Sequence, residues 1–191
     1  DLYPNFTYPL DPDNGDQSDQ LDDRGFVGGK VAWNRPLQLG RFANEPAIGM
    51  EFRRDDIDTV GLYRTVNRER IGTSREDAVV QTSYSAYSIL TTAWADYLRT
   101  SMGVRADYFD FDVSSHLAEN SGAASDSIVS PKFSLILGPW KETEFFVNVG
   151  KGFHSNDARG TTIRVDPTDG VTPADRVDPL VDALGADVGV R

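Results

Sequence analysis

Apolar and polar residues alternate with a period of two along much of the chain, and no stretch sustains the roughly 3.6-residue period of an amphipathic helix. The clearest alternation begins at Leu98. There Leu98, Thr100, Met102, Val104, Ala106 and Tyr108 oppose Arg99, Ser101, Gly103, Arg105 and Asp107. The pattern predicts an all-β, antiparallel protein whose strands present one apolar and one polar face.

The same alternation predicts strands at residues 26–34, 46–54, 131–138, 143–150 and 184–191, with others at 79–90 and, more weakly, 2–8. Together with the strand that begins at Leu98 they make about eight strands. Short connections are expected near 37–45, 91–96 and 138–142, and long ones near 9–25, 55–77, 112–130 and 154–181. Short turns at one end and long loops at the other are typical of an outer-membrane barrel.

Two interpretations of the faces follow from the pattern alone. In a soluble β-sandwich, charged residues such as Lys30 and Glu51 face solvent and the apolar side is core. In a membrane barrel the apolar side faces lipid and the polar side faces an aqueous lumen. Phe145, Val147 and Val149 then meet lipid, and Glu144 and Asn148 meet water. Aromatic residues near the expected turns fit either a membrane girdle or an ordinary core; they are Trp33, Trp94, Tyr97 and Trp140.

The amino-acid composition argues against several classes of function. The 191 residues carry a formal net charge of -11 with a pI near 4.5, so no basic stripe is available for nucleic acid. Cysteine is absent, which removes disulfides, thiolate metal sites and thiol nucleophiles. No apolar run approaches the roughly 18 residues that a membrane helix needs.

Motifs in the second half of the chain carry a family resemblance. The segment "SPKFSLILGPWKETEFFVNVGKGFHSNDARG", residues 130–160, reads as a descending strand, a tight turn and an ascending strand. The segments "SMGVRADYFDFDV", 101–113, and "VDPLVDALGADVGVR", 177–191, supply further strand motifs. In this order they resemble the β-barrel of TonB-dependent outer-membrane receptors.

The resemblance implies a location, a function and partners. The chain is expected to lie in the outer membrane of a Gram-negative bacterium, with residues 1–191 forming part of a receptor barrel. The implied function is TonB-dependent uptake of a scarce nutrient such as a ferric siderophore. The implied partners are a small-molecule ligand such as a metal chelate, outer-membrane lipid, and TonB acting through a plug domain.

Several features of such receptors are missing from this sequence. The plug domain, the TonB-contacting segment and a final strand ending in an aromatic residue are not present, and about eight strands replace the family's roughly 22. We therefore expect an internal barrel section that forms an open curved sheet, with short periplasmic turns and long extracellular loops. No cofactor, bound metal or catalytic residue is expected.

Candidate ligand-binding residues lie in two of the expected extracellular loops. Arginine pairs well with carboxylates, so the segment 65–77 is a candidate for an anionic ligand, although it also reads as a solvated mixed-charge loop. The loop after the strand at 143–150 contributes the other candidates. The full set is Arg68, Arg70, Arg75, His154, Asn156 and Arg159.

Calcium binding, metal binding by histidine and catalysis have weaker support in the sequence. The stretch Asp11–Asp23 is rich in carboxylates like a calcium loop but lacks EF-hand spacing, because no Glu follows at the twelfth position. His116 and His154 are the only histidines and lie in different expected loops, and no Ser–His–acid arrangement or nucleophile elbow is present. The alternative function is a soluble β-sandwich binding module, possibly calcium-dependent through Asp11–Asp23.

Overall fold

The computed structural model describes residues 2–5, 7–9, 12–13 and 15–191. The strands are β1 (Ser18–Asn34), β2 (Leu37–Leu39), β3 (Phe42–Val66), β4 (Glu69–Ala95), β5 (Leu98–Ser115), β6 (Gly122–Trp140), β7 (Thr143–Ser155) and β8 (Leu180–Val190). Two short helices, η1 (Ala118–Asn120) and α1 (Ala158–Thr162), lie in the connections. No helix in the described part of the chain is long and apolar enough to cross a lipid bilayer.

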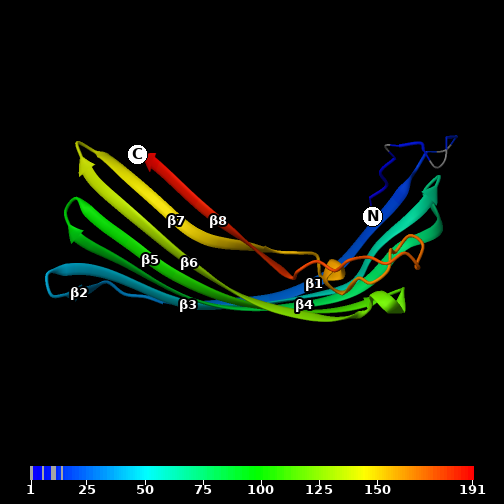
Figure 1. Cartoon of the computed structure of the whole chain (residues 1–191), viewed down its shortest axis with the longest axis horizontal. Coiled ribbons are helices and arrows are strands. Elements are labelled where there is room, and N and C mark those ends of the chain that lie inside the picture. Colours follow the sequence, from blue (N-terminus) through cyan, green and yellow to red (C-terminus); the bar gives the residue numbers. More distant parts are fainter. Residues whose placement is uncertain (1, 6, 10–11, 14) are drawn as a thin grey trace.

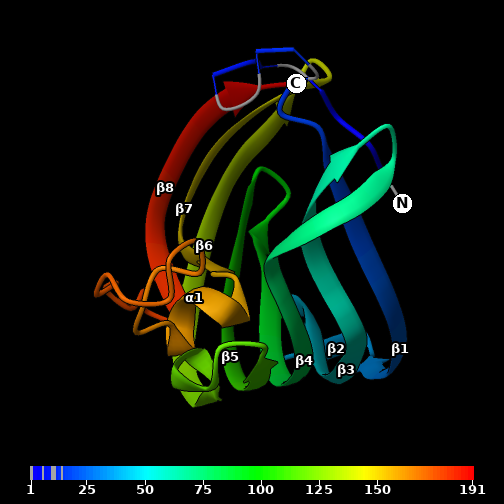
Figure 2. The same ribbon diagram turned by 90° about the vertical axis from the view of Figure 1, so that its right-hand side faces the viewer.

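All eight strands join one antiparallel sheet in the order β1-β3-β4-β5-β6-β7-β8, and β2 pairs with β3. The sheet is strongly curved, and β1 and β8 lie at its two separate edges (Figures 1 and 2). The predicted open, curved, all-β sheet of about eight strands is confirmed. The soluble sandwich is wrong, because the described strands form one sheet and not two packed layers.

Two of the expected long loops are largely strand. The stretch 55–77 continues β3 to Val66 and starts β4 at Glu69, and the stretch 112–130 contains the end of β5, η1 and the start of β6. At about 3.3 Å per residue, the 27 residues of β4 extend roughly 90 Å, far beyond an apolar band about 25 Å tall. Side chains of these extensions are buried on both faces, Asp77 and Val113 on one and Tyr63 on the other, so the sequence loses its simple alternation of apolar and polar residues and resembles a loop.

Two-residue turns close the β3–β4 and β6–β7 hairpins. Asn67 and Arg68 have φ of 53° and 67° between β3 and β4, and Lys141 and Glu142 have φ of 50° and 67° between β6 and β7. Successive positive φ values match the right-handed twist of the adjoining strands. The expected short connections near 91–96 and 138–142 and the long connection after His154 are confirmed, with β8 beginning at Leu180.

Before β1 the described residues form no strand. Leu2 makes an isolated bridge with Gln20, and Phe6, within the expected strand 2–8, lies outside the described residues. The expected loop 9–25 is only partly correct, because β1 already begins at Ser18.

One face of the sheet, here called the apolar face, carries exposed hydrophobic side chains in register across the strands. Val31 pairs with Met50, Met50 with Ala86, and Ala86 with Ala106. Met50 is 62% exposed and Leu184 is 82% exposed, so no described part of the chain covers these positions of the face. Between Leu98 and Tyr108 the face stays apolar over about the 9–11 residues that a tilted membrane strand needs.

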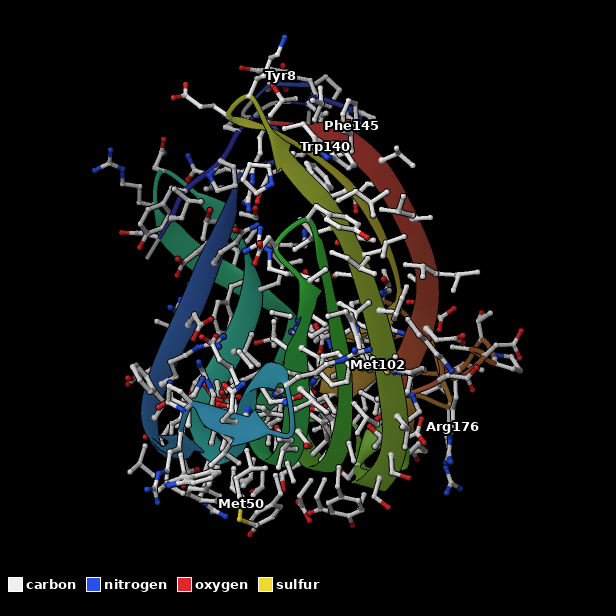
Figure 3. All side chains as sticks on the ribbon, turned by 90° about the vertical axis from the view of Figure 1, so that its left-hand side faces the viewer. Tyr8, Met50, Met102, Trp140, Phe145 and Arg176 are labelled. Carbon is white, nitrogen blue, oxygen red and sulfur yellow. The ribbon has the colours of Figure 1, made fainter. Side chains whose placement is uncertain are left out.

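Aromatic side chains border this band. At the end that holds the β4–β5 and β6–β7 turns, ring centroids lie 5.0 Å apart for Phe42 and Trp94 and 6.3 Å apart for Trp140 and Phe145. Figure 3 shows Trp140 and Phe145 together at this end. At the other border Phe52 lies 5.3 Å from Tyr84. Two aromatic borders around an apolar band are the pattern of a barrel wall in a bilayer.

The opposite face, here called the polar face, carries most of the charged pairs and a small hydrophobic core. Ala158 of α1 packs with Val79, Phe111 and Val113 on this face. Figure 1 shows α1 and the segment after it on the side toward which the sheet curves. Asn120 of η1 anchors the segment through its side-chain oxygen, which accepts hydrogen bonds from the amides of Arg164 and Val165.

Candidate ligand-binding surface on the polar face

Charged side chains on the polar face pair across neighbouring strands. Glu51 on β3 accepts from Lys30 on β1 at 2.7 Å and from Arg105 on β5 at 3.0 Å. Arg105 also binds Asp107 at 2.9 Å, and its second Nη donates to Ser85 at 2.8 Å. The network ties β1, β3, β4 and β5 together where alternation places every second side chain on one side.

A second cluster lies near α1, at the end of the sheet opposite the β6–β7 turn. Arg75 donates from Nε to Asp77 at 2.6 Å, and the Asp77 side chain is fully buried. Arg159 of α1 lies 4.0 Å from the same carboxylate oxygen. The structure therefore brings together two of the expected ligand-binding arginines around one buried acid.

Arg159 also binds Asp157, the residue that caps α1, with an Nη2–Oδ2 distance of 2.5 Å. Desolvation raises the pKa of Asp157, but the hydrogen bonds and the charge of Arg159 outweigh it and hold the pKa below its usual range. The hydrogen bond to Asp157 in turn raises the pKa of Arg159. Both groups are charged at neutral pH.

Two hollows adjoin this cluster and share Arg159 and Val60. One of about 590 Å³ is also lined by Gln20, Asp22 and Arg75. The other, of about 270 Å³, is lined by Arg24, Gln81 and Asn156 among others. The first falls within the range of about 300–1,000 Å³ typical of small-molecule sites. A larger hollow of about 730 Å³ opens among Met50, Tyr84 and their neighbours and is mostly apolar, so it does not suit a charged ligand.

Arg68 and Arg70 lie elsewhere. Arg68 is in the β3–β4 turn, where its amide donates to Gln17 at 2.8 Å. Arg70, on β4 and not in a loop, binds the fully buried Asp19 at 2.6 Å and stacks over Tyr63, 3.8 Å from the ring centroid. Because Tyr63 follows Leu62, which pairs with Arg75, it faces the opposite side of the sheet from Arg75. These two arginines therefore do not join the Arg75–Arg159 cluster.

His154 and Asn156 meet at the end of β7. The His154 ring nitrogen lies 3.0 Å from the Asn156 side-chain oxygen, and Asn156 donates to the Asp178 carbonyl at 2.7 Å. The pair holds the two ends of the 156–179 segment close to each other. His116 lies apart, with Nδ1 3.1 Å from the Glu76 carbonyl oxygen.

The described residues contain no group of three or more side chains arranged to hold a metal ion. Within the acidic stretch Asp11–Asp23, Asp19 binds Arg70 and Asp22 binds Arg24 at 2.5 Å. Asp11 lies outside the described residues. Two acids of the hypothetical calcium loop therefore serve as ion-pair partners of arginine.

Sequence reasoning missed the contribution of β1. Gln20, Asp22 and Arg24 line the hollows, although the sequence suggested a loop there. The sequence signal for a strand here was the spacing of these polar residues, which lie two positions apart, as residues on one face of a strand do. A bulge between Asp23 and Arg24 interrupts the register, and no apolar alternation accompanies them.

The geometry suits the binding of a ligand that carries both charge and hydrogen-bonding groups. Arginine and amide side chains from β1, β4 and α1 surround the hollows, and each arginine already has an aspartate neighbour. A ligand carboxylate would compete with these aspartates for the guanidinium groups. The surface offers charged and hydrogen-bonding groups for ligand recognition.

Comparisons with known proteins agree with this architecture. The family model for "TonB dependent receptor-like, beta-barrel" matches residues 1–179. A solved structure titled "Crystal structure of ferric citrate transporter FecA in the unliganded form" is similar with a TM-score of 0.63 at 11% identity. The similarity covers 72% of this chain but only 21% of that one. At this identity it shows the fold alone. No curated protein matches the sequence.

Proposed function

The chain belongs to the TonB-dependent receptor β-barrel family, and from this premise we propose that residues 1–191 are part of the barrel of an outer-membrane transporter. The observation that carries the proposal is the apolar face. Its uncovered hydrophobic side chains span about the height of a bilayer between two aromatic borders, while the opposite face is charged. Lipid covers the first face and the lumen meets the second.

In this arrangement the β4–β5 and β6–β7 turns lie on the periplasmic side. The β3–β4 turn, η1 and the 156–179 segment lie on the extracellular side. The Arg75–Arg159 cluster then lies on the lumenal wall near the outer mouth, where it meets incoming ligand. A plug domain and TonB supply the energised step that moves the ligand inward.

We propose a scarce nutrient in anionic form, such as a ferric siderophore, as the ligand. The support is the guanidinium and amide lining of the two hollows, together with the name of the similar structure, a ferric citrate transporter. Among the earlier candidates, Arg75, Arg159, His154 and Asn156 remain ligand-contact proposals at this mouth. Arg68 and Arg70 remain proposals for the neighbouring surface, and no residue is assigned a catalytic step.

The test is uptake of radioactive iron supplied as citrate by iron-starved cells that express the full-length protein. We expect uptake that requires both the protein and TonB, and a loss of most of it in Arg159→Gln. Arg54→Gln is the matched control, because Arg54 binds the exposed Asp56 at 3.4 Å outside the cluster. Accumulation that continues without TonB would contradict the proposed transport. Failure of iron citrate alone, with TonB-dependent uptake of another chelate, would correct only the ligand.

A further inference from the structure

Strands β6 and β7 are paired along only part of their length. Their pairing runs from the turn to Lys132 and Gly150 and then stops. Beyond that point β6 remains paired with β5 as far as Gly122, and β7 remains paired with β8 as far as Ser155. Figure 1 shows the two strands running apart. Pro131, the next residue of β6, has no amide hydrogen to donate to a continuing ladder.

A cavity of about 510 Å³ lies at this fork and reaches across the polar face to β1 and β3. We call it the fork cavity. Four cationic side chains line it, and Glu51 is the only acid among its lining residues. The cations are Lys30, Arg105, Lys132 and Lys151. The chain as a whole has a net charge of -11, so this local excess of positive charge is opposite in sign to the net charge of the protein.

The four cationic side chains differ in the acidic partners that offset their charge. Lys30 and Arg105 share Glu51, and Arg105 has Asp107 as a second partner. Lys151 lies 3.3 Å from Asp182, whose side chain is 64% exposed. Within the described part of the chain, Lys132 has no acidic partner within 4.0 Å. The fork therefore holds one uncompensated ammonium group and one weakly compensated one.

A hydroxyl group that lines the fork cavity has no hydrogen-bond partner among the described residues. Oγ of Ser130, two residues before Lys132, is buried from solvent and makes no hydrogen bond within the described residues. A buried donor left unpaired is unfavourable, because nothing replaces the hydrogen bond to water that it has lost. An acceptor placed in the cavity would remove that cost.

Glycines leave the space that the cavity needs. A Cβ on Gly103 would lie 2.8 Å from Cε of Lys132, so the lysine chain lies flat across that glycine. A Cβ on Gly49 would lie 2.5 Å from the Tyr87 ring, which lies over it in the same way. Larger residues at these two positions would push both side chains into the cavity.

We propose that the fork cavity binds a small free oxyanion, a phosphate or a compact polycarboxylate, with Lys132 and Lys151 as counter-charges and the Ser130 hydroxyl as donor. Hydrogen bonds between ammonium groups and anionic oxygens are among the stronger ones in proteins. The cavity shares no lining residue with the two hollows around Arg159. It is a second site, and its occupancy does not depend on the transport proposed above.

The test is equilibrium dialysis of the purified full-length protein in detergent and an anion-free buffer, with radioactive phosphate and, separately, citrate. We expect saturable binding of at least one anion and a loss of about tenfold or more in affinity for Lys132→Met, since a hydrogen bond to a charged group contributes about 1.5–3 kcal/mol. Lys132→Arg retains the charge and is expected to retain binding. Ser130→Ala is expected to weaken binding to a smaller extent.

Two controls separate this site from other causes. Lys141→Met removes an exposed lysine at the β6–β7 turn and is expected to bind the anion normally. Arg159→Gln alters the outer cluster and is expected to leave the fork binding unchanged, even if it abolishes uptake. The proposal is overturned if the unmodified protein shows no saturable binding of either anion. It is also overturned if Lys132→Met and Lys141→Met bind equally well.

Discussion

Arg159 on α1 lies 4.0 Å from the buried carboxylate of Asp77 on β4, although all of β5, β6 and β7 separates the two residues in the sequence. Asp77 also accepts from Arg75 at 2.6 Å. One acid thus links the barrel wall to the segment that folds over it. Both arginines line the same hollow of about 590 Å³.

Asp77→Asn is therefore expected to destabilise the protein by about 2–3 kcal/mol, because it removes the buried negative charge that pairs with Arg75. The matched variant is Asp56→Asn, which breaks an ion pair whose two side chains are 44% and 56% exposed. It should cost less than about 0.5 kcal/mol. Denaturant unfolding of the full-length protein in detergent measures both. Equal losses in the two variants would show that Asp77 has no special role.

Ala158→Asp places a carboxylate among Val79, Phe111 and Val113, where it has no partner. Burying an unpaired charge is costly, so α1 should leave the wall and the 156–179 segment should become exposed. Hydrogen exchange measured by mass spectrometry is expected to rise throughout that segment. Val171→Asp, at a position 77% exposed in the same segment, should leave the exchange unchanged.

Val104→Arg puts a charge near the middle of the apolar face. Arginine at the bilayer midplane of a barrel costs about 2–4 kcal/mol, and a loss of that size in unfolding free energy in lipid vesicles is expected. Ser134→Arg adds the same side chain to the polar face, close to Asp187 on the same row of the sheet. It should be tolerated, because that face meets water. A reversed order of the two losses would mean that the faces have been assigned the wrong way round.

Gly49→Ala should cost about 1–3 kcal/mol through overpacking, because the new methyl group would lie 2.5 Å from the Tyr87 ring. Gly29→Ala is the control on the neighbouring strand, where a Cβ would meet no atom within 4 Å. Thermal unfolding in detergent compares the two. If Gly49→Ala is as stable as Gly29→Ala, Tyr87 is free to move and the fork cavity is adaptable.

Acid should loosen the attachment of α1. The pKa of Asp157 in the folded protein lies below its usual range, which is near pH 4, so its contribution to stability is fully present above about pH 4. That contribution is lost as the pH falls through the lowered pKa. Hydrogen exchange in residues 157–164, corrected for the intrinsic rate, should therefore increase on acidification from about pH 5 to about pH 3. Asp157→Asn should lack this dependence, and an unchanged dependence would assign it to another group.

The order of strand motifs predicted the family, the open antiparallel sheet and the turns near 91–96 and 138–142. The predictions failed in particular places. Segments 55–77 and 112–130 read as loops because polar side chains such as Asp77 are buried there, so apolar and polar residues do not alternate in the simple way that marks the other strands. Arg70 and Arg75 looked like neighbours in one loop, yet they lie on opposite faces of the sheet around β4.

The sequence by itself determined which residues share the apolar face and which share the polar face, because the period-two pattern is imposed locally by the pleat of each strand. Only the tertiary structure decided which charges meet. The contact of Arg159 with Asp77 depends on how the segment after β7 folds back over β4. The fork at Lys132 and Gly150 depends on where two strands stop pairing, and backbone pairing between strands leaves no periodic mark on the side chains of either one.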